Sequence, residues 1–237
     1  MQEVFRRLNR ALARLEFGPP VTHVYNPLEY ALEPCLEYYR RFGQGTRDTL
    51  LLGMNPGPWG MAQTGVPFGE VEMVRDWLGI RGQVGSPAHP HPQRPVQGFD
   101  CPRSEVSGRR LWGWVRERFG TPDAFFRDHF IANYCPLMFM EESGRNRTPD
   151  RLPAREREPL FRACDEALAA LVDRLQPRRI IGVGRFAEQR AREALAGRDL
   201  KILRVTHPSP ANPGANRGWG EELDALLAAR TGASGRT

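Results

Sequence analysis

Polar side chains that could take part in a reaction lie where short apolar segments end and proline-rich segments begin. Asn55 and His207 each precede a proline in such places, and Asn133 stands three residues before one. A carboxamide can orient a water molecule or a ligand, and an imidazole can donate a hydrogen bond to developing negative charge. Taken alone, a histidine before a proline is more often structural than catalytic.

The segment around Asn55 is unusual in length and composition. Residues 53–70 contain five glycines and three prolines, and about fifteen of these residues separate an apolar run from the next helical pattern. Glycine lets backbone approach a ligand closely, and proline fixes the chain, so the segment resembles a preformed pocket wall. The alternative is a turn-rich connection, but connections of that kind need only about two to six residues.

The elements that position these residues follow from hydrophobic patterning. Apolar runs of strand length occur at 49–54, 130–133, 179–183 and 201–205, and each is typical of a strand covered on both faces. Helical spacing occurs at 3–16, 28–42, 71–78, 107–119, 159–175, 186–196 and 219–229. This alternation predicts an α/β fold with a central, mainly parallel four-stranded sheet between helical layers, in one domain over 1–237.

Ligands of open α/β sheets bind beyond the carboxyl ends of the strands. In this sequence those ends lead into four polar, proline-containing loops, at 55–58, 133–136, 184–186 and 206–210. We expect these loops to meet at one rim. The proline-rich segment 79–103 and the polar segment 141–151 are predicted to be irregular insertions.

Composition is that of an ordinary globular protein. Of 237 residues, 40% are hydrophobic and 26% charged, and no apolar stretch is long enough for a membrane span. The N-terminus lacks the features of a secretory signal, so we expect a cytoplasmic protein. The net charge of +6 is compatible with a polyanionic partner. Arg109, Arg110 and Arg185 are candidate phosphate contacts, although solvated helix ends explain them equally well.

Cysteine and lysine usage narrows the chemistry further. The four cysteines are isolated and form no C-x-x-C pair, so we expect no metal site and no cofactor. The only lysine is Lys201, which begins a predicted strand away from the polar rim. Schiff-base catalysis therefore has no evident nucleophile.

At the level of motifs the chain resembles the single-strand-selective monofunctional uracil-DNA glycosylases, a family of the uracil-DNA glycosylase superfamily, in a bacterial-type form. The matching segments are 53–70, 207–210, 212–213 and 216–219, with support from 104–108 and 133–137. The resemblance spans about 50–219 and implies a three-layer α/β/α sandwich. Trp59 stands where the family commonly has phenylalanine, a change we expect to be accommodated as packing.

The resemblance implies two catalytic residues. Asn55 matches the asparagine that positions the hydrolytic water near the sugar C1′. An amide is no strong base, which is acceptable if the glycosidic bond breaks mostly before water attacks. His207 matches the histidine that donates a hydrogen bond to uracil O2 as negative charge collects on the departing base.

The resemblance also implies how the base is selected. Asn133 matches the residue that reads the uracil edge, and its fixed amide would reject cytosine. Phe68 matches the aromatic residue that stacks on the extruded base. Gly57 and Met61 match the wall around the 5-substituent, and Met54 is a further substrate-binding candidate.

A last segment resembles the family's wedge, which enters the helix when the base is extruded. We expect Ser209, Pro210, Ala211, Asn212 and Arg217 to contact DNA. Ala211 stands where vertebrate members carry arginine, so penetration of the duplex falls to another residue such as Arg217 or is weaker. We therefore expect activity on single-stranded DNA and on U·G mismatches, and not efficient excision from U·A pairs.

The sequence thus predicts a monofunctional hydrolase of N-glycosyl bonds that initiates base excision repair by removing uracil, and also 5-hydroxymethyluracil or other altered bases. We expect it to act as a monomer on nucleoid DNA in a bacterial cytoplasm, without cofactor or membrane. Three alternatives stay open: a relative specialised for xanthine or hypoxanthine, a non-catalytic module that binds damaged DNA, and, more distantly, a small-molecule hydrolase.

Overall fold

The central feature of the fold is a four-stranded parallel sheet with the order β3-β2-β6-β7. The computed structural model describes residues 1–210, 212, 215 and 218–228. The strands are β2 (Thr49–Gly53), β3 (His129–Asn133), β6 (Arg179–Val183) and β7 (Lys201–Val205). Each coincides with a predicted apolar run, and β2 is buried along its whole length because it lies between β3 and β6. The predicted fold class is confirmed.

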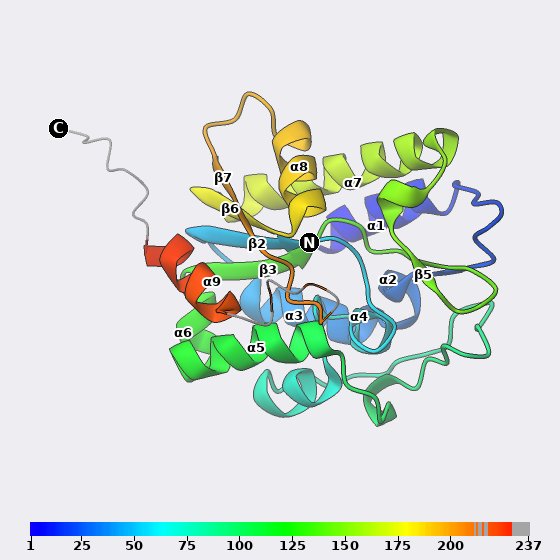
Figure 1. Cartoon of the computed structure of the whole chain (residues 1–237), viewed down its shortest axis with the longest axis horizontal. Helices are drawn as coiled ribbons and strands as arrows, with labels where there is room; N and C mark the ends of the chain where they lie inside the picture. Colours follow the sequence, from blue (N-terminus) through cyan, green and yellow to red (C-terminus); the bar gives the residue numbers. More distant parts are fainter. Residues whose placement is uncertain (211, 213–214, 216–217, 229–237) are drawn as a thin grey trace.

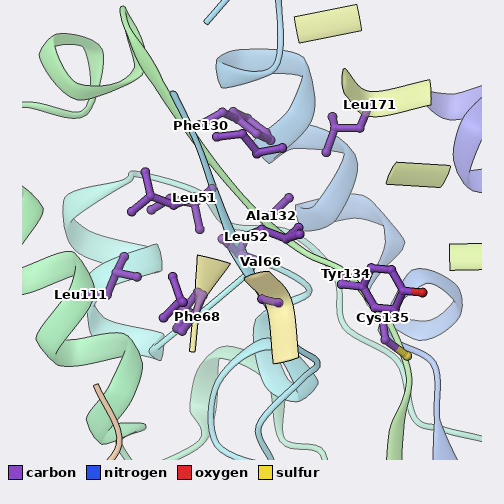
Figure 2. Close-up of a cluster of buried hydrophobic side chains, with 14 of the residues drawn as sticks. Leu51, Leu52, Val66, Phe68, Leu111, Phe130, Ala132, Tyr134, Cys135 and Leu171 are labelled. Atoms are coloured by element: carbon purple, nitrogen blue, oxygen red, sulfur yellow. The ribbon is translucent and has the colours of Figure 1, made fainter. Parts of the chain in front are cut away.

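Helices cover both faces of this sheet (Figure 1), with α1, α7 and α8 above it and α5, α6 and α9 below it in that view. Figure 2 shows Leu111 of α5 and Leu171 of α7 on opposite sides of the buried strands. The helix bounds are α1 Gln2–Leu12, α2 Pro27–Tyr30, α3 Leu32–Phe42, α4 Met61–Thr64, α5 Val106–Phe119, α6 Pro122–Phe126, α7 Ala154–Leu175, α8 Arg185–Ala194 and α9 Trp219–Ala228. Short 3-10 helices lie at Gly98–Asp100 and Pro149–Arg151.

Several local expectations need correction. The pattern at 28–42 forms two helices that are separated at Ala31. Helix α7 begins at Ala154, five residues before the predicted start, and runs through Pro159, which has no N–H to donate to the carbonyl oxygen of Arg155. Residues Met73–Trp77 adopt a π-helix. Strand β7 is an edge strand with Lys201 and Arg204 exposed, so it is not covered on both faces.

A second, antiparallel sheet was not predicted. It has the order β1-β4-β5 and consists of His23–Tyr25, Met138–Met140 and Asn146–Arg147. Strand β4 follows β3 after a short connection, and β5 comes from the polar segment that we expected to be irregular. This small sheet brings polar side chains of β5 to the carboxyl end of the main sheet.

None of the helices in the described part of the chain combines the length and apolar character that a membrane span needs.

Candidate active site

A cleft of about 400 Å³ lies at the carboxyl ends of the parallel strands. Its wall combines the loops after β2, β3 and β7 with the start of α5 and with β5. The lining residues are Met54, Asn55, Pro56, Gly57, Pro58, Phe68, Glu105, Ser107, Asn133, Asn146, Thr148, His207 and Ser209. The predicted convergence of loops on one rim is therefore confirmed for three of the four loops. The fourth, 184–186, is absent from the wall.

Asn55 is held in one orientation. Its Nδ2 donates a hydrogen bond of 3.2 Å to the carbonyl oxygen of Leu137, just before β4. Because the amide nitrogen is used in this bond, Oδ1 is the atom left to accept a hydrogen bond from a ligand or a water molecule. An acceptor of this kind can orient a nucleophilic water without acting as a strong base.

His207 is held in one tautomer. The backbone N–H of Ser209 donates to Nδ1 of His207 over 3.2 Å, so Nδ1 carries no proton and the neutral ring is protonated at Nε2. Burial in the cleft wall lowers the pKa of His207 below its ordinary value, because a charged imidazolium is poorly solvated there. The ring therefore presents a neutral Nε2–H donor.

Phe68 forms the aromatic part of the wall. Its ring centroid lies 6.2 Å from that of His207, with the planes tilted by 36°. Its backbone is left-handed, with φ at 52°, and its carbonyl oxygen accepts a hydrogen bond of 3.1 Å from the indole of Trp112. A non-glycine residue in this conformation persists only when its surroundings fix it, as they do here. Figure 2 places Phe68 at the side of Leu111.

Gly53 makes the approach of Phe68 possible. A Cβ atom at Gly53 would lie 2.6 Å from Cε2 and 2.8 Å from Cζ of Phe68, and it would also collide with Oδ1 of Asn133. The missing side chain lets an aromatic ring and an amide meet directly over the end of β2. Glycine is thus required here for space.

Asn133 carries an unsatisfied acceptor. Its Nδ2 donates to the Sδ of Met61 over 3.2 Å, while its buried Oδ1 has no hydrogen-bond partner among the described residues. Buried polar atoms are nearly always paired in folded proteins, so an unpaired one in a cleft indicates a place for a ligand donor. Met61 does not line the cleft; it lies behind the wall and contacts the amide that does.

Glu105 is a titratable group that the sequence did not single out. It precedes α5, and its carboxyl group packs where Cβ atoms on Gly57 and Gly60 would have to be. Burial, reinforced by the nearby Glu70, raises the pKa of Glu105 from 4.5 to about 7. The cleft therefore contains a carboxyl group that is largely protonated below neutral pH. Its position against these two glycines is a tertiary contact that no local pattern reveals.

Asn146 and Thr148 are further lining residues that sequence reasoning missed. They are two positions apart at β5, so they point to the same side, while Arg147 between them forms an ion pair with Glu141. The Oδ1 atom of Asn146 is buried without a partner among the described residues. Residues 141–148 are all polar or glycine, so no alternation of apolar and polar residues indicated a strand.

The segment after His207 is described in part. Ser209 lines the cleft, Pro210 is exposed, and Asn212 donates its N–H to the Ser209 carbonyl oxygen over 3.0 Å. Arg110 donates to the carbonyl oxygen of Pro208, which ties the segment to α5. The candidates Ala211 and Arg217 lie outside the described residues.

Groups of three or more histidine, cysteine, aspartate or glutamate side chains that could hold a metal ion do not occur within the described ranges. The four cysteines are free and buried.

Comparisons with known proteins bear on this site. Residues 41–226 match the family model described as the uracil DNA glycosylase superfamily. The single-strand selective monofunctional uracil-DNA glycosylase of Rattus norvegicus is 56% identical over 90% of this chain and 77% of its own length. Its counterpart in Bos taurus is 54% identical over 90% of this chain and 79% of its own length. The crystal structure of wild-type Pedobacter heparinus SMUG2 is similar in fold, with a TM-score of 0.64 and 17% identity over 95% of this chain and 96% of that one.

These similarities agree with the motifs around Asn55 and His207 and with the parallel sheet that positions them. The chain belongs to the single-strand selective monofunctional uracil-DNA glycosylase family of the uracil DNA glycosylase superfamily.

Proposed function

We propose that this protein hydrolyses the N-glycosidic bond of uracil in DNA and so begins base excision repair. The observation that carries the proposal is that one cleft contains both the oriented Oδ1 acceptor of Asn55 and the neutral His207 ring, with its proton on Nε2. The mammalian relatives are named as uracil-DNA glycosylases that are monofunctional and single-strand selective.

In the proposed reaction the bond between C1′ of the sugar and N1 of uracil breaks, and its electron pair remains on the base. His207 donates from Nε2 to uracil O2 as negative charge develops there, and a fixed donor of this kind accelerates a reaction by a few kcal/mol, about 10²–10³-fold. Asn55 accepts a hydrogen bond from a water molecule that then attacks the oxocarbenium-like C1′. The proton that water loses is balanced by protonation of the uracil anion.

Base selection follows from the other lining groups. The unpaired Oδ1 of Asn133 accepts a hydrogen bond from uracil N3–H. Its Nδ2 donates to uracil O4 in place of the Sδ of Met61. Cytosine offers an unprotonated N3 and an amino group at these positions, so neither bond forms and the amide is left unpaired. Phe68 supplies a stacking surface worth about 1–3 kcal/mol. We propose that 5-hydroxymethyluracil is also accepted, with its substituent near Gly57.

The substrate is reached by extruding the nucleotide from the strand, which costs a few kcal/mol in a duplex and less in a single strand. Ser209, Pro210 and Asn212 belong to the segment that we propose to fill the vacancy, together with Ala211 and Arg217. Since alanine occupies the proposed wedge position, we propose that single-stranded DNA and U·G mismatches are better substrates than U·A pairs. We further propose that the protein acts as a monomer in the cytoplasm.

Monofunctional action is consistent with the position of the only lysine. Lys201 pairs with Arg179 at the amino-terminal end of β7, whereas His207 follows the carboxyl end of the same strand. A strand length therefore separates the lysine from the cleft, and a Schiff base with the sugar has no amine there.

The test is excision from oligonucleotides that carry one uracil, 5-hydroxymethyluracil, xanthine or hypoxanthine, followed by alkaline cleavage of abasic sites. We expect product from single-stranded uracil DNA and no strand scission before alkali. Asn55→Ala and His207→Ala should each lower cleavage by orders of magnitude and leave DNA binding largely intact. Absence of product from every substrate would overturn the proposal. Loss of binding without loss of turnover would overturn the assigned roles.

A further inference from the structure

A cluster of one aromatic ring and two guanidinium groups lies beside the cleft. Trp59 directly follows Pro58, which lines the cleft wall. The guanidinium carbon of Arg103 lies 4.5 Å from the centroid of the Trp59 ring, and that of Arg94 lies 5.4 Å from it. Both distances are within the range of a cation–π contact. Trp59 therefore contacts two guanidinium groups in addition to lying in the loop that contains Asn55.

These two guanidinium groups have hydrogen-bonding capacity to spare. Arg94 donates from Nε to the Gly144 carbonyl oxygen over 2.9 Å and from Nη1 to the Gln93 carbonyl oxygen, which leaves Nη2. Arg103 is exposed, and its guanidinium has no protein acceptor among the described residues. Neither group forms an ion pair in that part of the chain. Many other arginines do, for instance Arg190 with Asp165 and Arg118 with Asp224.

The cluster is fixed relative to the reacting residues. The bond from Arg94 to Gly144 ties it to the turn before β5, and β5 supplies Asn146 to the cleft wall. The bond between Trp59 and Pro58 ties it to the loop that contains Asn55. Two guanidinium groups without an ion pair among the described residues thus lie beside the cleft, and Arg94 is bonded to the turn that leads into β5.

We propose that Arg94 and Arg103, oriented by Trp59, form a phosphate-binding subsite for the DNA strand next to the extruded nucleotide. The contacts with the indole hold both guanidinium groups beside the cleft, where Arg103 keeps a full N–H edge for a ligand and Arg94 keeps Nη2. A planar edge of this kind matches the oxygens of a phosphodiester in a bidentate manner, which a lysine cannot do. The inference rests on the proposed function, since it takes the ligand to be DNA.

The first test is the salt dependence of binding. The probe is a single-stranded oligonucleotide with one uncleavable 2′-fluoro-deoxyuridine. Its binding is measured by fluorescence anisotropy at several salt concentrations. Each lost phosphate contact on a single strand lowers the slope of log K against log salt by about 0.7. We expect R94Q/R103Q to lower that slope by about 0.7–1.4. An unchanged slope would overturn the proposal.

A charge-matched control is available at the other end of the sheet. Arg127 precedes β3 and Arg198 precedes β7, and both are therefore at the amino-terminal edge, away from the cleft. R127Q/R198Q removes the same net charge and should leave the slope as it is in the wild type. A slope lowered equally by both double variants would mean a general charge effect and would also overturn the subsite.

A second test locates the phosphate and separates a contact from bulk electrostatics. Single phosphates of the oligonucleotide are replaced in turn by neutral methylphosphonates. We expect the wild type to lose affinity at one or two linkages beside the deoxyuridine, and R94Q/R103Q to be indifferent at those same linkages. Equal losses for both proteins at every linkage would overturn the proposal. Trp59→Phe should retain the wild-type response, and Trp59→Leu should weaken it.

Failure of the subsite and failure of the proposed function have different signatures. Excision by the wild type under single-turnover conditions with saturating protein tests the proposed function alone, because this measurement does not depend on either arginine variant. If the wild type itself excises nothing, the proposed function fails. If the wild type excises uracil and the variant binds DNA with unaltered salt dependence, only the subsite fails.

Discussion

The backbone N–H of Ser209 donates to Nδ1 of His207 over 3.2 Å, and this one bond decides which nitrogen of the imidazole ring carries the proton. The donor comes from two residues further along the chain, within the run of prolines at 208 and 210. Proline restricts the backbone there, so the N–H is aimed before any ligand arrives. The segment that follows β7 therefore determines the chemistry of the histidine as well as its position.

The first prediction concerns the charge of His207. Because burial lowers its pKa, the imidazole should stay neutral when the pH falls below 6.5, which is the ordinary pKa of histidine. Titration by NMR with ¹⁵N-labelled histidine should report an Nε2–H tautomer at pH 7. A ring that is protonated on both nitrogens at pH 7 would contradict the proposed donor. The folded state should lose the corresponding stability as pH falls below about 6.5, where the unfolded chain takes up a proton more readily.

The second prediction concerns Gly53. A methyl group at this position would collide with the Phe68 ring and the Asn133 amide, so Gly53→Ala must displace both groups. We expect about 1–3 kcal/mol of lost stability in denaturant unfolding and a large fall in kcat/KM for uracil excision.

Gly113 on α5 is a matched control for this substitution, because a Cβ there would meet no atom within 4 Å. Gly113→Ala should leave excision unchanged and stabilise the helix by about 0.5–1 kcal/mol. If Gly53→Ala behaves like the control, then close approach of Phe68 is not what the site requires.

The third prediction concerns Glu105. Its pKa is raised to about 7 in the folded protein from 4.5, so the folded state binds the proton more tightly than the unfolded chain does. Stability should consequently fall as the pH rises through the window between these values. Glu105→Gln removes that ionisation. The free energy of unfolding of the variant minus that of the wild type should therefore be larger at pH 8 than at pH 5, by on the order of 1–3 kcal/mol.

Denaturant unfolding of both proteins at pH 5 and pH 8 measures this difference. The exposed Glu117 of α5, the helix that Glu105 precedes, provides the control: Glu117→Gln removes a carboxylate outside the cleft and is measured in the same way. An equal effect of Glu105→Gln at pH 5 and pH 8 would mean that Glu105 is not neutral in the folded cleft.

Strands that are buried on both faces can be recognised in the sequence, whereas polar strands cannot. Strands β2 and β6 could be predicted because a strand buried on both faces needs an unbroken apolar run, and such runs are visible in the sequence. Strand β5 could not, since Asn146 and Arg147 are polar and pair only with β4. The raised pKa of Glu105 was equally hidden, because it arises from burial and from Glu70, which is 35 positions away in the chain.

The last prediction concerns this unpredicted strand. Asn146 lines the cleft with a buried Oδ1 that has no partner among the described residues, and such an atom gains a hydrogen bond when a donor of the bound nucleotide or its water enters. Asn146→Ala removes that bond, so kcat/KM for uracil excision from single-stranded DNA should fall by about 2- to 10-fold. Ser143→Ala, at an exposed position of the same hairpin, should have no such effect. If Asn146→Ala and Ser143→Ala are equally active, Asn146 does not contact the substrate. In that case β5 would serve only to pair with β4, and the proposed polar contacts to the nucleotide would be those of Asn55, Asn133 and His207.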